Sequence, residues 1–272
     1  MLLQRTLTAL LLAPLVFLII LLPPTWLFAP IVVVAFLAAL WEWTRLSGLR
    51  DRAVRSGLLA LGLVLFGVLW WLRDSLLWPA LLLAGVAWWL LACLWLRHFA
   101  FAASPTPEHR NLKLLAGVFV IFPAWTALLM IHRGQPHGPW WTFLALAIVW
   151  AADIGAYFSG RFLGKRKLAP QISPGKTWAG VYGAFVAGAL VMAGGGWLLD
   201  VRDGQLLGLV LVALVTVAAS IVGDLVESLM KRHAQVKDSG TLFPGHGGLM
   251  DRLDSVFAAL PVFALGKWML GL

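Results

Sequence analysis

Long runs of apolar residues, separated by short polar connections, follow one another along the whole chain. A helix needs about 20 apolar residues to cross the hydrocarbon core of a bilayer, so runs of this length predict membrane spans. No stretch alternates apolar and polar residues as a half-buried strand would. We therefore expect an all-α, polytopic integral membrane protein with nine spans, at residues 7–22, 26–45, 57–72, 76–96, 112–131, 139–159, 177–199, 206–230 and 253–271.

The first apolar run is short and ends at Pro23-Pro24, so it could be read as a signal peptide with Arg5 in its n-region. Further runs follow at once and no small-residue cleavage site is convincing, which favours a retained helix. We interpret residues 1–272 as one membrane domain, with N-terminal spans over 1–135 and a more polar part over 136–272. In the N-terminal spans Glu42 is the one acid, and we expect it to snorkel or to pair with Arg45.

The basic residues are distributed unevenly between the two sides of the predicted membrane. The net charge is +9, and seventeen of the 21 Lys and Arg residues fall on the side of the N-terminus. The other side has only Arg73, Arg133, Arg202 and Lys267. The positive-inside rule then predicts a cytoplasmic N-terminus and a C-terminus outside. Topology and attraction to anionic headgroups explain the excess charge, so we expect no nucleic-acid partner.

Polar residues interrupt the spans within residues 150–255, always on the predicted cytoplasmic side. Asp153, Tyr157 and Arg161 have i, i+4, i+8 spacing, which places them along one stripe of a helix. The small residues between positions 155 and 160 would let a neighbouring helix approach closely. An acid this deep in a span indicates a functional site. The alternative is that Asp153 pairs with a lysine and serves packing.

The connection at residues 160–177 is strongly basic. Its cations, followed by Ser173, Lys176 and Thr177, suit phosphate oxygens. A Walker A loop is excluded, because that loop needs a glycine five residues before its second glycine and this chain has Pro170 there. The Ser173-Pro174 pair instead predicts a helix entry, whose amides and positive dipole could bind an anion. For the cations at 165–167, positive-inside charge alone remains the alternative.

Acidic residues occur at the end of the eighth predicted span and at the start of the ninth. Asp224 and Glu227 end the eighth span, and Asp251 and Asp254 begin the ninth, each pair at an offset of 3. Two helix ends with inward carboxylates, joined by a short glycine loop, can hold one or two hard divalent cations. Mg²⁺ commonly takes one or two carboxylates together with substrate phosphates. The alternative is a salt-bridge network in which these acids and nearby bases neutralise one another.

The loop between these helices contains a Pro-Gly-His-Gly-Gly turn. His246 in this turn either contacts substrate or only forms hydrogen bonds, and the sequence leaves both open. Cys93 is the single cysteine, so a disulfide within the chain and a cysteine-rich metal site are excluded. Without a His-Glu-x-x-His motif a zinc site is not expected. Gly245, Gly247 and Gly248 are expected to shape the backbone and to expose amides to a phosphate.

Residues 228–255, called the signature segment below, combine these features at fixed spacing. They include Ser228, Lys231, Arg232, Lys237, Asp238, Pro244, Gly245, His246, Gly247, Gly248, Asp251, Arg252, Asp254 and Ser255. This pattern resembles that of the phosphatidate cytidylyltransferases, also called CDP-diacylglycerol synthases. The region from Asp153 to Lys176 is also similar. One departure is present: the family often has S-P-K-K-T-x-E-G, whereas this chain has Gly175 and Ala179 at two of these positions.

The resemblance implies transfer of a cytidylyl group from CTP to phosphatidate, giving CDP-diacylglycerol and pyrophosphate, with Mg²⁺ and in some cases a second cation. It also implies a homodimer in the bacterial cytoplasmic (inner) membrane, among membrane lipids, with the active site facing the cytoplasm. The implied metal ligands are Asp224, Asp251, Asp254 and Glu227, and Lys237 joins Asp224, Asp251 and Asp254 as a catalytic residue. Substrate contacts are implied for Ser228, Lys231, Arg232, Asp238, His246, Gly247, Gly248, Arg252, Ser173, Lys176, Asp153 and Arg161.

Three other functions fit the sequence less well. A transporter using Asp153 and Asp224 would have polar residues across the depth of the bilayer, whereas here they gather on one side. A CDP-alcohol phosphotransferase would carry a D-G-x-x-A-R signature, which this chain lacks. A rhomboid-type serine protease would need a Gly-x-Ser-Gly motif inside a span, and none is found.

Overall fold

The computed structural model describes residues 14–242 and 247–272 and is helical almost throughout. Eight described helices correspond in order to the last eight predicted spans. They are α2 (Thr25–Leu46), α3 (Arg52–Trp71), α4 (Leu77–Arg97), α5 (Pro107–Arg133), α6 (Gly138–Leu163), α7 (Trp178–Leu198), α8 (Asp203–His233) and α9 (Met250–Met269). Residues 14–21 are also helical, and the start of the first predicted span lies outside the described residues.

Seven of these helices, α2 to α8, are long and apolar enough to cross a membrane. The predicted fold class, an all-α polytopic membrane protein, is therefore confirmed. The ninth helix differs from the others in composition, because α9 carries Asp251, Arg252, Asp254 and Lys267 within its 20 residues.

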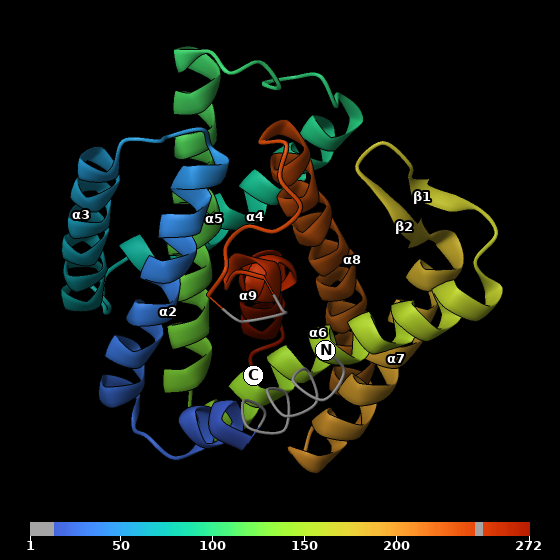
Figure 1. The fold of residues 1–272 in the computed structure, drawn as a ribbon. Helices are drawn as coiled ribbons and strands as arrows, with labels where there is room; N and C mark the ends of the chain where they lie inside the picture. Colours follow the sequence, from blue (N-terminus) through green and yellow to red (C-terminus); the bar gives the residue numbers. More distant parts are fainter. Residues whose placement is uncertain (1–13, 243–246) are drawn as a thin grey trace.

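Helix α9 lies at the centre of the molecule, with α2 and α5 on one side and α8 on the other (Figure 1). It also contacts α4 and α6. Its middle is fully buried, with Phe257 and Phe263 among the largest side chains of the core. The charged first turn of α9 consequently lies next to α8 at the end of the bundle, and this position builds the site.

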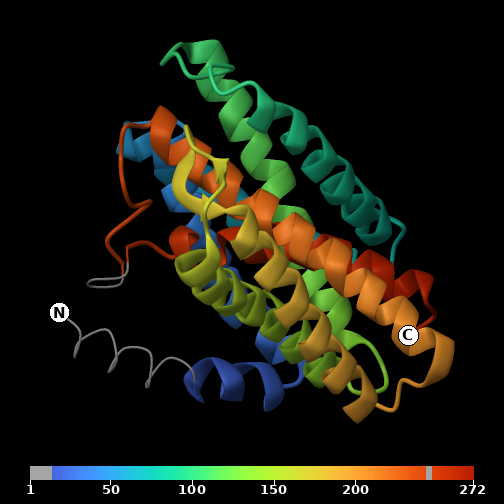
Figure 2. The same cartoon turned by 90° about the vertical axis from the view of Figure 1, so that its right-hand side faces the viewer.

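A short β-hairpin interrupts the helices, and the expectation of no strands is wrong at this point. Strands β1 (Lys167–Ala169) and β2 (Ser173–Thr177) pair antiparallel, and the hairpin projects at the ends of α6 and α7 (Figure 2). The predicted helix entry at Ser173-Pro174 is therefore part of a strand. Helix α7 begins only after Thr177, whose Oγ1 accepts a hydrogen bond from the Gly180 amide. A hydroxyl cap of this kind is the usual start of a helix.

The connections predicted to be cytoplasmic meet at one end of the bundle. Arg232, near the end of α8, donates from Nε to the carbonyl of Ile172 in the hairpin. The neighbouring His233 hydrogen-bonds the carbonyl of Phe99 in the connection between α4 and α5. At the opposite end Arg133 pairs with Asp74. The grouping agrees with the predicted alternation of connections between two sides, while the orientation in a membrane stays a prediction.

Candidate functional site

Glycines bring helices α6 and α7 into close contact beside the site. A Cβ added to Gly155 would lie 2.5 Å from the carbonyl oxygen of Gly183 in α7. Ser159, one turn further along α6, donates from its hydroxyl to the Gly155 carbonyl. The prediction that small residues near Asp153 admit a neighbouring helix is confirmed. The hairpin that joins these helices thus begins at the C-terminal end of α6 and leads into the start of α7.

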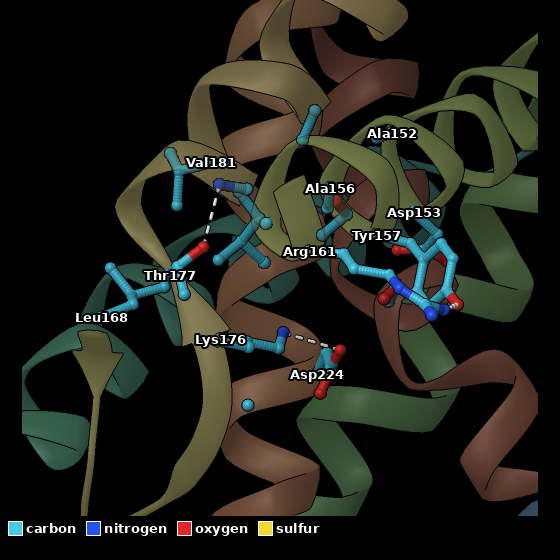
Figure 3. Close-up of a pocket in the computed structure, with 17 residues that line it drawn as sticks. Ala152, Asp153, Ala156, Tyr157, Arg161, Leu168, Lys176, Thr177, Val181 and Asp224 are labelled. Carbon is cyan, nitrogen blue, oxygen red and sulfur yellow. Dashed lines mark hydrogen bonds and ion pairs between the residues drawn. The ribbon is translucent and has the colours of Figure 1, made fainter. Parts of the chain in front are cut away.

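A pocket with a volume of about 470 Å³ opens between α6, α7, α8 and strand β2, and Ser255 of α9 also lines it. Asp153 and Arg161 of α6, Lys176 of β2 and Asp224 of α8 line it together (Figure 3). These residues come from two polar regions that lie far apart in the sequence. The structure thus joins the basic connection at 160–177 to the acids at the end of α8.

Lys176 and Asp224 form an ion pair in this pocket, with 2.6 Å between Nζ and Oδ2 (Figure 3). Their side chains are only 24% and 29% exposed. Ser228 donates from its hydroxyl to the other carboxylate oxygen of Asp224 at 3.3 Å. On the far wall Arg161 donates from Nη1 to the phenol oxygen of Tyr157 at 2.6 Å. The pocket therefore offers a ligand two cationic side chains, Arg161 and Lys176, and two carboxylates, Asp153 and the ion-paired Asp224.

Helices α8 and α9 bring their acids together because they pack closely at a glycine. A Cβ on Gly223 would lie 2.5 Å from the Asp254 carbonyl oxygen, so no larger residue fits there without displacement. Asp254 is close enough to Asp224 and to Glu227 for their charges to interact. The predicted convergence of carboxylates from the last two helices is confirmed.

Lys231 bridges the two helices at this convergence. Its Nζ lies 2.6 Å from Glu227 Oε2 and 2.7 Å from Asp251 Oδ1. Glu227 is almost completely buried. The salt-bridge network considered as an alternative is therefore present in part, since Lys176 and Lys231 each neutralise acids of the cluster. It accounts for neither the pocket nor the remaining acid, Asp254, at the helix contact.

Asp251 also holds the backbone of the signature segment. Its Oδ2 accepts hydrogen bonds from the Ser239 amide at 2.9 Å, the Ser239 hydroxyl at 2.8 Å and the Gly248 amide at 2.8 Å. The expectation that Gly248 presents a free amide to a phosphate is therefore not met. Gly247 has φ +79, and a Cβ there would lie 2.6 Å from Asp251 Oδ2, so both glycines serve the turn around this aspartate.

Glu42 joins the same loop from the N-terminal part of the chain, and the expectation that it snorkels or pairs with Arg45 is wrong. It is 6% exposed, and its carboxylate accepts hydrogen bonds from Ser239, Leu249 and Met250. The prediction failed because the partner loop is almost 200 positions away, as the separation of 197 from Ser239 shows. An acid within an apolar span was the signal that could have identified it.

The other predicted site residues lie around this centre. Lys237, Asp238, Arg232 and Arg252 are exposed at the same end of the bundle, and Ser173 is half-buried in β2. The charge of Arg252 interacts with that of Asp153. His246 lies outside the described residues, as do Pro244 and Gly245 of the predicted turn. Their expected roles stay predictions.

The acids of the site have the chemistry of a Mg²⁺ site. Carboxylate oxygens are its preferred protein ligands. Glu227 contributes a buried oxygen, Oε1, without a hydrogen-bond partner among the described residues. Within residues 14–242 and 247–272, no three acidic, histidine or cysteine side chains already form a common coordination group. Lys176 and Lys231 form ion pairs with carboxylate oxygens of these acids. The oxygen ligands fit Mg²⁺, which would share these oxygens with the lysines or replace the lysine contacts.

Comparison with known proteins gives a consistent result. A model of the cytidylyltransferase family matches residues 3–269. The chain is 40% identical to the phosphatidate cytidylyltransferase of Pseudomonas aeruginosa, over 100% of this chain and 98% of that protein. It is 36% identical to the enzyme of the same name from Haemophilus influenzae, over 97% of this chain and 98% of that protein. The Bacillus subtilis enzyme is 44% identical over 131 residues, 48% of each chain.

Proposed function

Because the chain belongs to the cytidylyltransferase family, we propose that the pocket between α6, α8 and β2 and the adjoining acids of α9 form its active site. The enzyme transfers a cytidylyl group from CTP to phosphatidate, giving CDP-diacylglycerol and pyrophosphate. The observation that carries this site is the convergence of Lys176, Asp224, Lys231 and Asp251 from three separate elements. Cations and carboxylates side by side suit a substrate that is both polyanionic and metal-bound.

The reaction needs positioning and charge neutralisation more than proton transfer. A phosphatidate oxygen, already anionic, attacks the α-phosphorus of CTP in line with the departing pyrophosphate. One P–O bond forms as the bond between the α-phosphorus and the bridging oxygen breaks, and that oxygen leaves with pyrophosphate. Lys176, Arg161 and Lys231 would donate hydrogen bonds to phosphate oxygens and balance their charge, which dominates catalysis in phosphoryl transfer.

The predicted metal ligands, Asp224, Glu227, Asp251 and Asp254, would hold one or two Mg²⁺ ions. The metal, when bound, neutralises charge on the attacking and leaving oxygens. With this metal bound, the carboxylates of α8 and α9 would hold the triphosphate within reach of Lys176 and Arg161. Asp254 is half-buried at the contact between α8 and α9, where its charge interacts with those of Asp224 and Glu227.

The position of the site among the basic connections supports an orientation of the protein in the membrane. The pocket and the described part of the signature segment lie at the end of the bundle where the basic connections gather. The positive-inside rule therefore favours a cytoplasmic position for them, where CTP is available. Phosphatidate would enter from the surrounding bilayer through the exposed side of α6 and α7. We propose the bacterial cytoplasmic (inner) membrane as the location, and a homodimer as the resemblance implies.

Purified protein tests this proposal directly. We expect CDP-diacylglycerol and pyrophosphate from CTP and phosphatidate with Mg²⁺, and no product when EDTA is added. Asp251→Asn keeps an oxygen for the loop but loses the charge, so we expect turnover to fall on the order of a hundredfold or more. Asp74→Asn, at the opposite end, is the control and should keep full activity.

Two results would contradict the proposal. If folded wild-type protein makes no CDP-diacylglycerol from CTP and phosphatidate, the function itself is refuted. If Asp251→Asn retains full turnover with an unchanged melting temperature, the function survives and the role of Asp251 is refuted.

A further inference from the structure

We propose that Glu42 is a positioning residue for this reaction. It is located in α2, in the N-terminal half of the chain, and it fixes the first turn of α9 and the loop before it. The inference rests on the proposed function, because it concerns how Asp251 and Asp254 are presented to α8. Glu42 itself lies behind the loop and is not a catalytic residue.

The carboxylate of Glu42 is bound on both of its oxygens. Oε1 accepts a hydrogen bond from the Leu249 amide at 3.0 Å. Oε2 accepts from the Met250 amide at 2.7 Å and lies 2.8 Å from the Ser239 hydroxyl, whose single proton is shared between Glu42 and Asp251. Two backbone amides, together with a hydroxyl proton that Glu42 shares with Asp251, compensate much of the desolvation of this buried carboxylate, because hydrogen bonds to a charged group are the stronger ones.

These contacts supply the helix cap that α9 lacks. The first amides of any helix have no acceptor within the helix, and a side chain next to the start usually provides one. The N-cap residue of α9, Leu249, has no side chain able to do so. Glu42 accepts from the amides at this end instead and places a negative charge at the positive end of the helix dipole.

Two glycines of the loop leave the space that the Glu42 carboxylate occupies. A Cβ added to Gly240 would collide with the Glu42 carboxylate, and one added to Gly248 would collide with it as well. Neither glycine has a positive φ, so the need here is space rather than backbone conformation. The final glycine of the Pro-Gly-His-Gly-Gly turn is thus explained by an acid from another helix.

A continuous set of contacts connects Glu42 to the chemistry. The Ser239 hydroxyl lies 2.8 Å from Glu42 Oε2 and 2.8 Å from Asp251 Oδ2. The other oxygen of Asp251 contacts Lys231, which in turn contacts Glu227. Displacing the loop from Glu42 would therefore move Asp251 relative to the acids of α8.

The test is Glu42→Gln, which keeps the shape but replaces one acceptor oxygen with an NH₂ group facing an amide donor. We expect kcat to fall about tenfold to a hundredfold, as a displacement of about 1 Å at a reacting site can cause. The Mg²⁺ concentration for half-maximal activity should rise, while KM for phosphatidate stays unchanged. Glu108→Gln, an exposed glutamate in the first turn of α5, is the matched control.

Hydrogen exchange gives a readout that does not depend on activity. In Glu42→Gln the amides of Leu249 and Met250 should exchange faster, while those in the middle of α8 keep wild-type rates. Ser239→Ala removes the hydroxyl between the two carboxylates, so it should show the same rise in Mg²⁺ requirement to a smaller extent.

The outcomes separate this inference from the proposed function. Wild-type protein without cytidylyltransferase activity refutes the function. An active wild type together with a folded Glu42→Gln that has wild-type kcat, Mg²⁺ dependence and exchange refutes the positioning role. If Glu42→Gln does not fold, Ser239→Ala decides, and an unchanged Mg²⁺ requirement in that variant overturns the proposal.

Discussion

At the scale of single residues, two lysines balance the acids of the site. Lys176 neutralises Asp224 in the pocket, and Lys231 lies between Glu227 and Asp251. A partly buried carboxylate without a counter-charge would be costly, so each lysine stabilises the fold of the site. Each also has N–H donors that can turn to phosphate oxygens. Structural pairing and substrate binding are therefore compatible roles for the same side chain.

Lys176→Met tests this dual role. We expect kcat/KM for CTP to fall by about 30-fold, because removing one partner of a hydrogen-bonded charge pair costs about 2 kcal/mol or more, and each 1.4 kcal/mol is a factor of about ten. Arg97→Met, an exposed cation at the end of α4 on the same side, should stay within about twofold of wild type.

Steady-state kinetics at saturating phosphatidate measures both variants. Equal, small losses in the two would show that general positive charge, rather than the position of Lys176, is what matters.

Residues with local partners could be predicted from the sequence, and those with distant partners could not. Helical offsets alone place Asp224 with Glu227, and Asp251 with Asp254, on shared faces. Lys176 could be assigned to phosphate chemistry but not to Asp224, because the hairpin geometry decides that pairing. Glu42 was assigned to Arg45, a neighbour on its own helix, when its partners lie in the signature segment.

At the scale of elements, the site depends on helices that approach through glycine. The contact of Gly155 with Gly183 fixes α6 against α7, and that of Gly223 with Asp254 fixes α8 against α9. In a bilayer such contacts matter more than apolar burial, since the lipid is as apolar as the helix surface. Close backbone packing is therefore what orients Asp153 and Asp224 toward one pocket.

Gly155→Ala should destabilise the protein by about 1–3 kcal/mol, because the added methyl group overpacks a contact with little room to relax. The same substitution at Gly194 in α7 meets no atom within 4 Å and should leave the stability equal or slightly higher. Thermal unfolding of both variants in one detergent measures the difference. A Gly155→Ala variant as stable as Gly194→Ala would show that the α6–α7 contact adapts without cost.

The hairpin is the element that sequence patterns did not predict. Its strands have three and five residues, too few for the alternation that identifies a strand, and Pro170 and Pro174 lie within or beside them. Helix boundaries were predicted to within a few residues, with the largest differences at the starts of α3, at Arg52 rather than 57, and of α5, at Pro107 rather than 112. The first turn of each helix is polar, so the apolar pattern alone misses it.

At the scale of the whole molecule, the two ends of the bundle differ in chemistry. One end gathers the hairpin, the signature segment and most of the basic residues. The other has isolated pairs such as Arg133 with Asp74. The order of the helices could be predicted because each is a long apolar run, and seven of the described helices have the length and composition of a membrane span. Their arrangement around α9 could not, since that depends on packing between distant segments.

Cysteine labelling tests the orientation in intact cells. In a Cys93→Ala background, Ser104→Cys lies in the connection between α4 and α5, and Ser75→Cys lies in that between α3 and α4; both serines are exposed. We expect a membrane-impermeant maleimide to label Ser75→Cys in spheroplasts and Ser104→Cys only after permeabilisation. The opposite pattern would place the site outside the cytoplasm and separate it from CTP.

The central position of α9 has a consequence for biogenesis. Asp251, Arg252, Asp254 and Lys267 each oppose insertion by up to about 3 kcal/mol if they must enter lipid on an isolated helix. This helix is translated after the segments whose surfaces accept its charges, such as Glu42 in α2 and Lys231 in α8. We therefore expect α9 to enter the membrane against protein that is already folded, and the acids of α9 reach the site only once this helix has docked.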